Sequence, residues 1–281
     1  MRDAIAFLVA AGRSLAAYVA VGLYVLVVGP PGIAVALLLD KPIVLYRAGV
    51  YGARLLLFLA GIRYVVAGPG RVLEDRAAIY CLNHTSHLET PIFYLVVQRL
   101  FPNVQIIYKK SLRKLPILGR CFDVGGFVPI DRHDREQSDR AIATAAGNLR
   151  QGKSFFVFPE GTRSQTGELL PFKKGPFVLA IQSQAPIVPV ALIGPGRAMR
   201  RGSPLIWPVT VTVRLGRPLE TAGTTYNDRN RLMEETRSGI AALLEAGPAS
   251  AEEAPEAAPS RTSASESLDA PVPPRRPESN A

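Results

Sequence analysis

The sequence predicts an α/β domain with a mixed, mostly parallel sheet flanked by helices, preceded by a hydrophobic membrane-helix motif at the N-terminus. Three observations predict this fold class. The chain has 281 residues and 48% hydrophobic content, which is enough for one large core. Short apolar runs alternate with helical patterns over most of its length. The first part of the chain contains a long stretch without a charged residue.

This uncharged stretch runs from Ser14 to Leu39 and is 26 residues long. It is long enough to cross a hydrocarbon core of about 30 Å, and too long for a cleaved signal peptide. The motif "GPPG" at 29–32 predicts that the helix kinks there or turns into a re-entrant hairpin.

The segment that follows, 42–63, has the pattern of an amphipathic helix. Arg47 and Arg54 lie two helical turns apart on one face, and the other face is rich in Leu, Val and Phe. This pattern is typical of a helix lying at a membrane interface, and the alternative is a core helix with exposed arginines. We therefore expect residues 1–62 to form membrane-anchoring helices.

The α/β domain is expected over residues 63–246. Seven apolar runs predict its strands, at Arg63–Ala67, Ala78–Leu82, Val104–Tyr108, Phe127–Ile130, Phe155–Phe158, Ile187–Ile193 and Val209–Leu215. Helical patterns lie at Leu88–Leu100, Arg135–Gln151, Pro176–Gln184 and Asp228–Glu245. The polar motifs come directly after strands, where open α/β sheets bind their ligands.

The segment from Gly247 to Ala281 is rich in Ala, Pro, Ser and Glu and has no aromatic residue. It is predicted to be a disordered tail, because it has too little apolar surface to bury. Without it, residues 1–246 carry 30 basic and 17 acidic groups, a net charge near +13 against +10 for the whole chain. Such a charge favours anionic partners, either nucleic acid or phospholipid headgroups.

The chain contains two cysteines, Cys81 and Cys121. This number argues against a disulfide framework and favours a reducing compartment. There is no cluster of Cys and His residues with the spacing of a structural zinc site.

The stretch "LNHTSHLETP" at 82–91 holds two of the three histidines in the chain. A metal site is disfavoured, because it needs three or four ligands and the remaining histidine, His133, is distant in sequence. Ser86 and Glu89 fit a helix capping box, which leaves His84 unexplained. In a catalytic interpretation, Glu89 accepts a hydrogen bond from one imidazole nitrogen of His84, and the other nitrogen takes a proton from a hydroxyl group. The same carboxylate can serve in both capping and orientation.

Three further motifs follow strands: "GGFVPIDR" at 125–132, "VFPEGTRS" at 157–164 and "IVPVALIG" at 187–194. Arg132 and Arg163 offer forked donors that suit a phosphate. Each motif alone is better explained by an exposed turn with a salt bridge.

Together and in this order, the four motifs resemble those of the 1-acylglycerol-3-phosphate acyltransferase family. The resemblance covers roughly residues 60–220 and includes Asn83 and His84, the "FVPIDR" segment, the "FPEGTRS" segment at 158–164 and Pro189. One departure is Glu89, which stands where the family has aspartate.

The resemblance implies that His84 is a general base oriented by Glu89. It further implies that Arg132 and Arg163 hold the phosphate of the acceptor, in a pocket shaped by Glu160, Gly161 and Thr162. Lys110, in the basic run "YKKSLRKLPILGR" at 108–120, is a further candidate for this phosphate. The run is explained equally well as a solvated or membrane-facing loop.

The implied reaction moves an acyl group from acyl-coenzyme A or acyl-carrier protein to the sn-2 hydroxyl of lysophosphatidic acid, with no metal or other cofactor. Glycerol 3-phosphate or another lysophospholipid is an alternative acceptor, and an inactive membrane-bound binder of anionic lipid is an alternative function. Nucleic acid is disfavoured, since only Tyr108 and Phe122 adjoin the basic run. We expect a bacterial inner-membrane location, among membrane lipids, with the active site on the cytoplasmic face.

Overall fold

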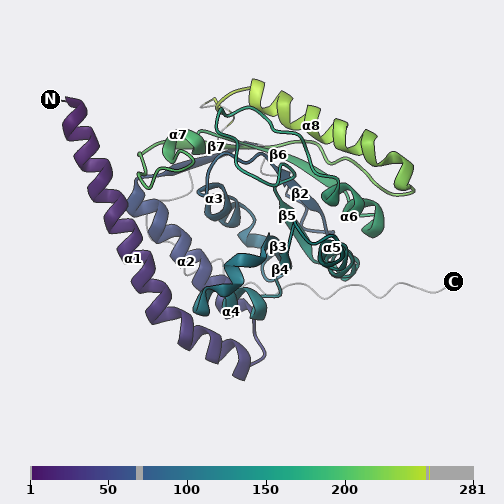
Figure 1. The fold of residues 1–281 in the computed structure, drawn as a ribbon, viewed down its shortest axis with the longest axis horizontal. Coiled ribbons are helices and arrows are strands. Elements are labelled where there is room, and N and C mark those ends of the chain that lie inside the picture. Colours follow the sequence, from purple (N-terminus) through teal and green to yellow (C-terminus); the bar gives the residue numbers. More distant parts are fainter. Residues whose placement is uncertain (1, 68–71, 251–252, 254–281) are drawn as a thin grey trace.

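The computed structural model describes the chain except for residues 1, 68–71, 251–252 and 254–281 (Figure 1). Its centre is a sheet of seven strands in the order β1-β7-β6-β2-β5-β3-β4. The strands are β1 (Arg63–Ala67), β2 (Ile79–Leu82), β3 (Val104–Lys109), β4 (Val128–Ile130), β5 (Ser154–Val157), β6 (Ile187–Ile193) and β7 (Thr210–Leu215). Every predicted strand is present to within one or two residues.

The sheet is mixed and mostly parallel, as predicted. The neighbours β6, β2, β5, β3 and β4 are mutually parallel. Strand β7 is antiparallel to β6, and β1 is parallel to β7. The carboxyl ends of β2, β5 and β4 therefore lie at one edge of the sheet, and the polar motifs follow those ends.

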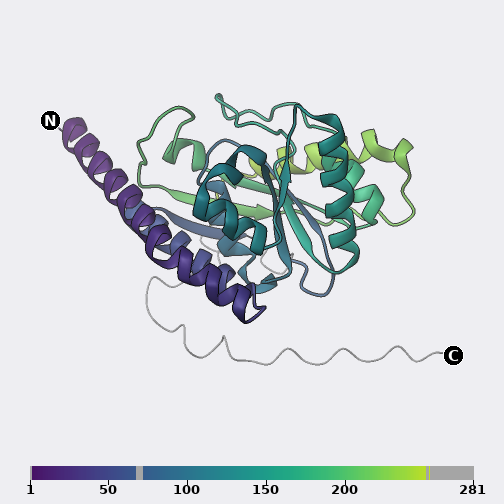
Figure 2. The ribbon, with the colours of Figure 1, turned by 60° about the horizontal axis from the view of Figure 1, so that its bottom comes forward.

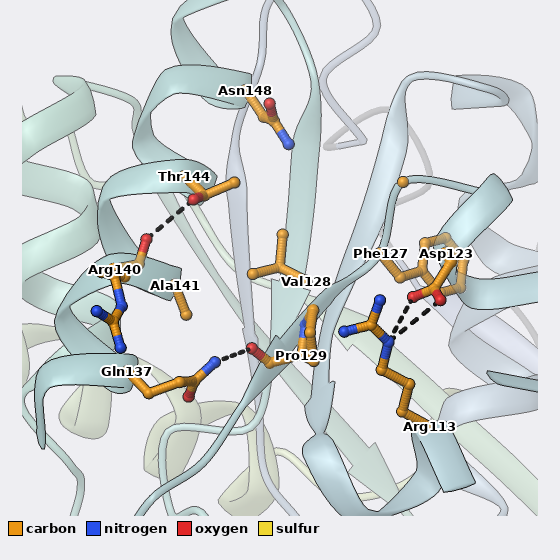
Figure 3. Close-up of a pocket in the computed structure, with 11 residues that line it drawn as sticks. Arg113, Asp123, Phe127, Val128, Pro129, Gln137, Arg140, Ala141, Thr144 and Asn148 are labelled. Atoms are coloured by element: carbon orange, nitrogen blue, oxygen red, sulfur yellow. Dashed lines mark hydrogen bonds and ion pairs between the residues drawn. The ribbon is translucent and has the colours of Figure 1, made fainter. Parts of the chain in front are cut away.

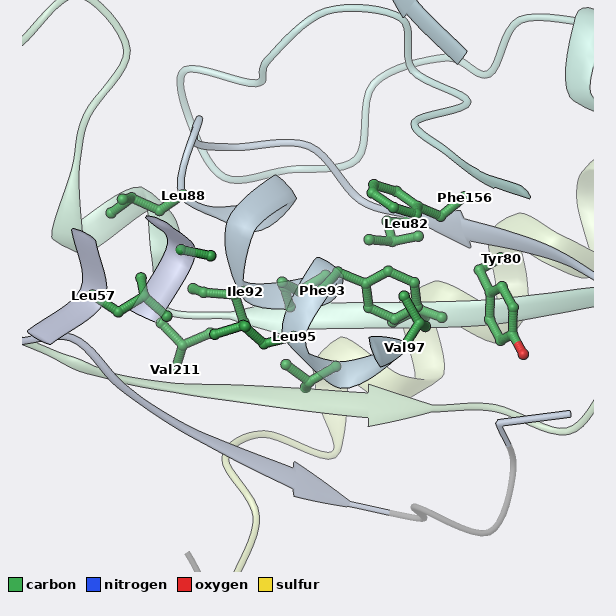
Figure 4. Close-up of a cluster of buried hydrophobic side chains, with 14 of the residues drawn as sticks. Leu57, Tyr80, Leu82, Leu88, Ile92, Phe93, Leu95, Val97, Phe156 and Val211 are labelled. Atoms are coloured by element: carbon green, nitrogen blue, oxygen red, sulfur yellow. The ribbon is translucent and has the colours of Figure 1, made fainter. Parts of the chain in front are cut away.

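Two hydrophobic layers cover the two faces of the sheet. On β2, Tyr80 and Leu82 belong to one buried cluster and Ile79 and Cys81 to the other, as the alternation of side chains along a strand requires. Helices α2 (Ile43–Ala60) and α3 (Glu89–Val96) supply the first cluster (Figure 4). Helices α5 (Arg135–Arg150), α6 (Gly175–Ser183) and α8 (Arg229–Glu245) supply the second.

The helix predicted at Leu88–Leu100 is shorter than expected. Helix α3 ends at Val96, and a separate 3₁₀ turn, η2 (Gln98–Leu100), follows. The other three predicted helices correspond to α5, α6 and α8. Two further helices, α4 (Pro116–Val124) and α7 (Pro195–Ala198), have no counterpart in the prediction.

The N-terminal helix α1 (Arg2–Leu38) continues through Pro30 and Pro31 without reversing. The chain turns back only afterwards, where Asp40 adopts a left-handed conformation with φ 50°. Of the two outcomes predicted for 29–32, a kink or a re-entrant hairpin, the hairpin is therefore wrong; Figure 1 shows the helix changing direction toward its C-terminal end. Helices α1 and α2 then run side by side in opposite directions (Figure 2).

The apolar face of α2 packs into the α/β domain and does not face lipid. Val50, Ala53, Leu57 and Ala60, spaced three or four residues apart, all belong to the core cluster above β2. Arg47 and Arg54 are exposed, and Tyr51 and Phe58 of the same helix are 54% and 77% exposed. The prediction that this face lies at a membrane interface is therefore wrong. The same helical spacing of apolar residues suits both a lipid surface and a protein core. Residues 1–62 are consequently not a unit separate from the domain.

Helix α1 presents large apolar side chains to its surroundings. Leu8, Val27 and Leu38 are 67%, 68% and 84% exposed. Asp3–Leu38 and Ile43–Ala60 are both long and apolar enough to cross a membrane. So much contiguous exposed apolar surface is unusual for a protein that is surrounded by water.

The basic run at 108–120 is folded against α1. It forms a 3₁₀ turn, η3 (Lys110–Lys114), and the first turns of α4. A side chain at Gly29 of α1 would collide with Ile117 of α4, so glycine at this position permits the close approach of the two helices.

The predicted tail begins too early. The guanidinium of Arg214 on β7 donates to the carbonyl oxygens of Gly247 and Pro248, and it pairs with Glu253 at 2.7 Å. Arg214, like Thr221, is a buried polar residue. Its hydrogen-bond acceptors Gly247, Pro248 and Glu253 all belong to the predicted tail. Residues 247–250 and 253 therefore belong to the folded domain, and the rest of the predicted tail lies outside the described residues.

Candidate active site

Two loops meet at the carboxyl edge of the sheet. One follows β2 and the other follows β5, and they are joined by the N–H of Ser164, which donates to the carbonyl oxygen of His84 at 2.7 Å. Asn83 fixes the first loop to β6, since its side chain both donates to the carbonyl oxygen of Leu192 and accepts from the Leu192 N–H. The position of His84 is thus determined from both sides.

His84 and Glu89 are in direct contact. Nδ1 of His84 lies 2.6 Å from Oε2 of Glu89, whose side chain is fully buried. An ionised carboxylate only accepts hydrogen bonds, so Nδ1 carries the hydrogen and Nε2 of a neutral ring has a free lone pair. Among the described residues, no group bonds to Nε2. The His84 side chain is 16% exposed, which leaves that nitrogen open to a ligand.

The second oxygen of Glu89 accepts three hydrogen bonds from the loop before the helix. Oε1 accepts from the N–H of Thr85 at 2.7 Å, from its hydroxyl at 2.6 Å and from the N–H of Ser86 at 3.0 Å. Only half of the expected capping box is formed, because the Ser86 hydroxyl accepts from the N–H of Leu88 instead of Glu89. Since α3 begins at Glu89, with Leu88 as its N-cap and no side-chain cap, this carboxylate does not cap the helix: it holds the loop ahead of the helix and contacts the histidine.

Two residues that contribute to this arrangement were not identified from the sequence. Thr85 holds the carboxylate, and Phe158 stacks on the His84 ring with centroids 4.0 Å apart and an angle of 25° between the planes. The position of Thr85 next to His84 was a usable signal for the first. No local signal indicates the second, because Phe158 reaches His84 only through the pairing of β2 with β5.

Glu160 is buried and connects three segments. Its Oε1 accepts from the N–H of His84 at 2.7 Å, and its Oε2 accepts from the N–H of Leu170 at 3.0 Å. Burial raises the pKa of Glu160, an effect that these two backbone donors oppose. Its carboxylate thus holds the loops that surround His84.

Arg132 lies beside the turn at Gly161. Gly161 has φ +71°, which favours glycine, and a Cβ placed there would lie 3.7 Å from Nη1 of Arg132 and 3.3 Å from Cγ of Lys173. Partial burial lowers the pKa of Arg132, although a guanidinium remains charged at neutral pH. The guanidinium of Arg132 and the aliphatic stem of Lys173 therefore lie against a turn that has no side chain of its own.

The remaining predicted residues lie around this turn. Thr162 is exposed, and the carbonyl oxygen of Arg163 accepts from Nη1 of Arg201 at 2.9 Å. Partial burial first, and then the electrostatic effects of Arg163 and of the His84 ring, lower the pKa of His87. Lys110 lies 3.7 Å from Asp131, the residue before Arg132, so its charge is partly neutralised by a carboxylate.

The structure has two surface hollows that are not lined by His84 or Glu89. One, of about 370 Å³, lies between β4, α4 and α5 (Figure 3). The other, of about 490 Å³, is lined by Arg197, Arg200, Ser203 and Trp207. Within the described part of the chain, no three His, Cys, Asp or Glu side chains are placed to hold a metal ion.

Residues 63–193 match the family model described as Acyltransferase. An uncharacterized acyltransferase of Schizosaccharomyces pombe is 35% identical over 182 residues, which cover 63% of this chain and 64% of that protein. The 1-acyl-sn-glycerol-3-phosphate acyltransferase of Limnanthes douglasii is 34% identical over 202 residues, 70% of each chain. The match thus spans less than two thirds of the length of the Schizosaccharomyces pombe protein and more than two thirds of the length of the Limnanthes douglasii enzyme.

The fold is also similar to a solved structure. The crystal structure of the 1-acyl-sn-glycerophosphate (LPA) acyltransferase PlsC from Thermotoga maritima superposes with a TM-score of 0.70 at 24% identity. The similarity covers 87% of this chain and 98% of that one, so it extends beyond the α/β domain. At this level of identity it supports the fold alone.

Proposed function

The chain belongs to the family of 1-acyl-sn-glycerol-3-phosphate acyltransferases, and from this premise we propose that it acylates the sn-2 hydroxyl of 1-acylglycerol 3-phosphate. The product is phosphatidic acid, and the acyl donor is a thioester of coenzyme A or of acyl-carrier protein. The observation that carries the proposal is the contact of 2.6 Å between His84 and the buried Glu89, with Nε2 of His84 left open.

The proposed reaction is a direct transfer. The acceptor hydroxyl attacks the thioester carbonyl carbon while Nε2 of His84 removes the hydroxyl proton. The new C–O bond forms, the C–S bond breaks, and the thiolate takes the proton from the imidazolium. Glu89 stabilises the imidazolium and holds the tautomer in which Nε2 accepts. Glu160 is a positioning residue that holds the backbone of His84. No metal or other cofactor takes part.

The acceptor phosphate binds at the turn after β5 in this proposal. Arg132 lies over Gly161, and Arg163 is in the same turn, so both offer forked donors to a phosphate. Gly161 and Thr162 form the floor and rim of the pocket. Lys110 contributes less, because Asp131 competes for its charge.

The location that we propose is a membrane surface, which agrees with the exposed apolar side chains of α1. The acceptor is itself a membrane amphiphile, so an enzyme held at the interface takes it without moving its acyl chain into water. We propose the inner membrane of a bacterium, with the site on the cytoplasmic side where thioester donors are made.

The test is acyl transfer by purified full-length protein in detergent micelles. The acceptors are lysophosphatidic acid, glycerol 3-phosphate and uncharged-headgroup lysophospholipids, each with both donor types, and lipid mass spectrometry identifies the products. We expect phosphatidic acid from lysophosphatidic acid. Equal rates with acceptors that lack a phosphate monoester would contradict the phosphate site.

His84→Ala is the matched control, and it also separates an enzyme from an inactive lipid binder. Loss of a positioned general base costs about 10²–10⁴-fold in rate. The melting temperature is expected to stay within a few degrees of the wild type, because the ring is partly exposed. A rate above about a tenth of the wild-type value would exclude His84 as the base.

A further inference from the structure

The segment between β6 and β7 forms a hollow that has no role in the reaction described above. Residues 194–207 contain α7 and three arginines but no acidic residue. Arg197, Arg200, Ser203 and Trp207 line a space of about 490 Å³, which we name the β6–β7 hollow. Trp207 is half-buried, so part of its ring surface faces outward.

The β6–β7 hollow is fastened directly to the reaction site. The Ser86 hydroxyl donates to the carbonyl oxygen of Met199 at 3.1 Å, and Arg201 donates to that of Arg163 at 2.9 Å. A Cβ placed at Gly196 would lie 3.2 Å from the hydroxyl of Thr85. The hollow therefore begins next to the loop that carries His84 and Glu89.

On its other side the segment is held by α1. The Tyr18 hydroxyl donates to the carbonyl oxygen of Pro204 at 2.6 Å, and the Ile206 N–H donates to the Ser14 hydroxyl at 2.8 Å. Attachment at both ends keeps Arg197, Arg200 and Trp207 in a fixed relation to the site. Such pre-organisation lowers the entropy cost of binding a ligand there.

The charge of the β6–β7 hollow is not neutralised by the protein. Among the described residues, Arg197 and Arg200 have no carboxylate partner. The hollow in Figure 3 is different, because Arg113 pairs with Asp123 at 3.1 Å and Arg140 with Glu136 at 2.7 Å. Two unpaired guanidinium groups with a neighbouring serine hydroxyl favour phosphate oxygens as ligands.

A phosphate ligand alone does not explain an indole beside the arginines. Aromatic side chains among basic groups provide a stacking surface for a nucleobase. The acyl donor class offers one molecule that has both features: coenzyme A carries phosphates and an adenine at the end opposite its thioester. An acyl-carrier protein presents only the pantetheine phosphate and no nucleobase.

We propose that the β6–β7 hollow binds the nucleotide end of an acyl-coenzyme A donor, a proposal that rests on the proposed acyl transfer. Arg197, Arg200 and Ser203 bind its phosphates, and adenine stacks on Trp207. The pantetheine arm then runs past Ser86 and delivers the thioester carbonyl to His84. This arrangement selects coenzyme A over acyl-carrier protein.

Fluorescence tests binding without any reaction. Trp207 is the single tryptophan of the chain, so all tryptophan emission reports on this hollow. Full-length protein in detergent micelles is titrated with coenzyme A, dephospho-coenzyme A and pantetheine 4′-phosphate. We expect saturable quenching with coenzyme A, and none with pantetheine 4′-phosphate, which has no base to stack. Arg197→Ala and Arg200→Ala should each weaken coenzyme A binding by about tenfold or more.

Kinetics test the assignment of the donor. In Arg197→Ala and Arg200→Ala, the KM for acyl-coenzyme A should rise by about tenfold or more relative to the KM for the same acyl group on pantetheine. Trp207→Phe should raise it less than Trp207→Leu, because phenylalanine retains a ring. Arg217→Ala is the matched control: Arg217 is also an exposed arginine, lies outside the hollow and should change neither KM.

Each other outcome overturns the proposal. An equal rise in the KM for acyl-coenzyme A and in the KM for the acyl-pantetheine would place the arginines at the pantetheine part that both donors share. Reduced binding to vesicles of anionic phospholipid, with an unchanged KM for acyl-coenzyme A, would assign them to lipid headgroups. Transfer from acyl-carrier protein without coenzyme A binding would overturn the donor assignment and leave the proposed function intact. Coenzyme A binding without transfer to any acceptor would instead contradict the proposed function.

Discussion

The two oxygens of Glu89 have different partners, and this difference makes the residue testable. Oε2 contacts Nδ1 of His84, whereas Oε1 accepts from Thr85 and Ser86. In glutamine one oxygen is replaced by an NH₂ group. The three donors around Oε1 retain the remaining oxygen, so the NH₂ must face His84.

We predict that Glu89→Gln lowers the rate by about 10²-fold or more, because an NH₂ donor at Nδ1 forces the ring hydrogen onto Nε2 and removes the base. Glu89→Asp should keep measurable activity, since it retains the charge. The measurements are kcat and KM for both substrates, with the melting temperature as a control for folding. If Glu89→Gln retains the wild-type rate, Glu89 only holds the loop before α3 and does not act on His84.

The two arginines at the turn after β5 are expected to affect substrate binding, whereas Glu89 affects the rate. Arg163→Ala, and to a lesser degree Arg132→Ala, should raise the KM for lysophosphatidic acid by about tenfold to a hundredfold, with little change in the donor KM. Lysine should restore only part of the binding, because an ammonium cannot make two parallel contacts. Steady-state kinetics with each substrate varied in turn provide the test. A selective rise in the donor KM would move these arginines to the donor side of the site.

At the scale of elements, the contact of α1 with α4 depends on one glycine. A side chain at Gly29 would collide with Ile117, whereas Gly22 of the same helix has nothing within 4 Å of an added Cβ. The absence of a side chain at Gly29 therefore lets α1 pack closely against Ile117 of α4.

We predict that Gly29→Ala destabilises the protein by about 1–3 kcal/mol, the usual cost of overpacking. Gly22→Ala is the matched control and should be neutral or slightly stabilising, as alanine is the better helix former. In an Ile117→Ala background the cost of Gly29→Ala should fall, which gives a coupling energy of about 0.5–3 kcal/mol. Unfolding in detergent micelles is measured for the wild type, the three single variants and the double variant. Additive effects would show that α4 does not rest on Gly29.

At the scale of the whole molecule, the apolar N-terminal segment and the folded domain share a helix. Val50, Ala53, Leu57 and Ala60 of α2 are part of the core, so removal of residues 1–62 would expose that core. The smaller deletion is 1–39, which removes α1 together with its contacts to Pro204 and Ile206 and keeps α2. The exposed apolar surface lost in this way is the part that is suited to lipid.

We predict that the full-length protein pellets with membranes and resists both high salt and a carbonate wash. The 1–39 deletion should lose activity on bilayer-embedded lysophosphatidic acid far more than on a soluble, short-chain acceptor, because only the former requires placement at the interface. Release of the full-length protein by salt alone would indicate peripheral, electrostatic attachment. Equal loss on both acceptors would indicate damage to the fold.

The sequence by itself determined the seven strands, the order of the polar motifs and the pairing of His84 with Glu89. Strand burial and short-range spacing are local properties, and parallel strands bring their carboxyl ends to one edge whatever the details of packing. His84 and Glu89 are joined by one short loop of four residues, so their geometry is also local.

The tertiary structure alone decided which surface each apolar face meets and which charges are paired. The period of α2 fits lipid and core equally, and only the layer of β2 and α3 beneath it decides for the core. Phe158 reaches His84 through strand pairing. Arg197 and Arg113 look alike in the sequence, but only the fold gives Arg113 a carboxylate. These outcomes depend on partners distant in the chain, and no local pattern records them.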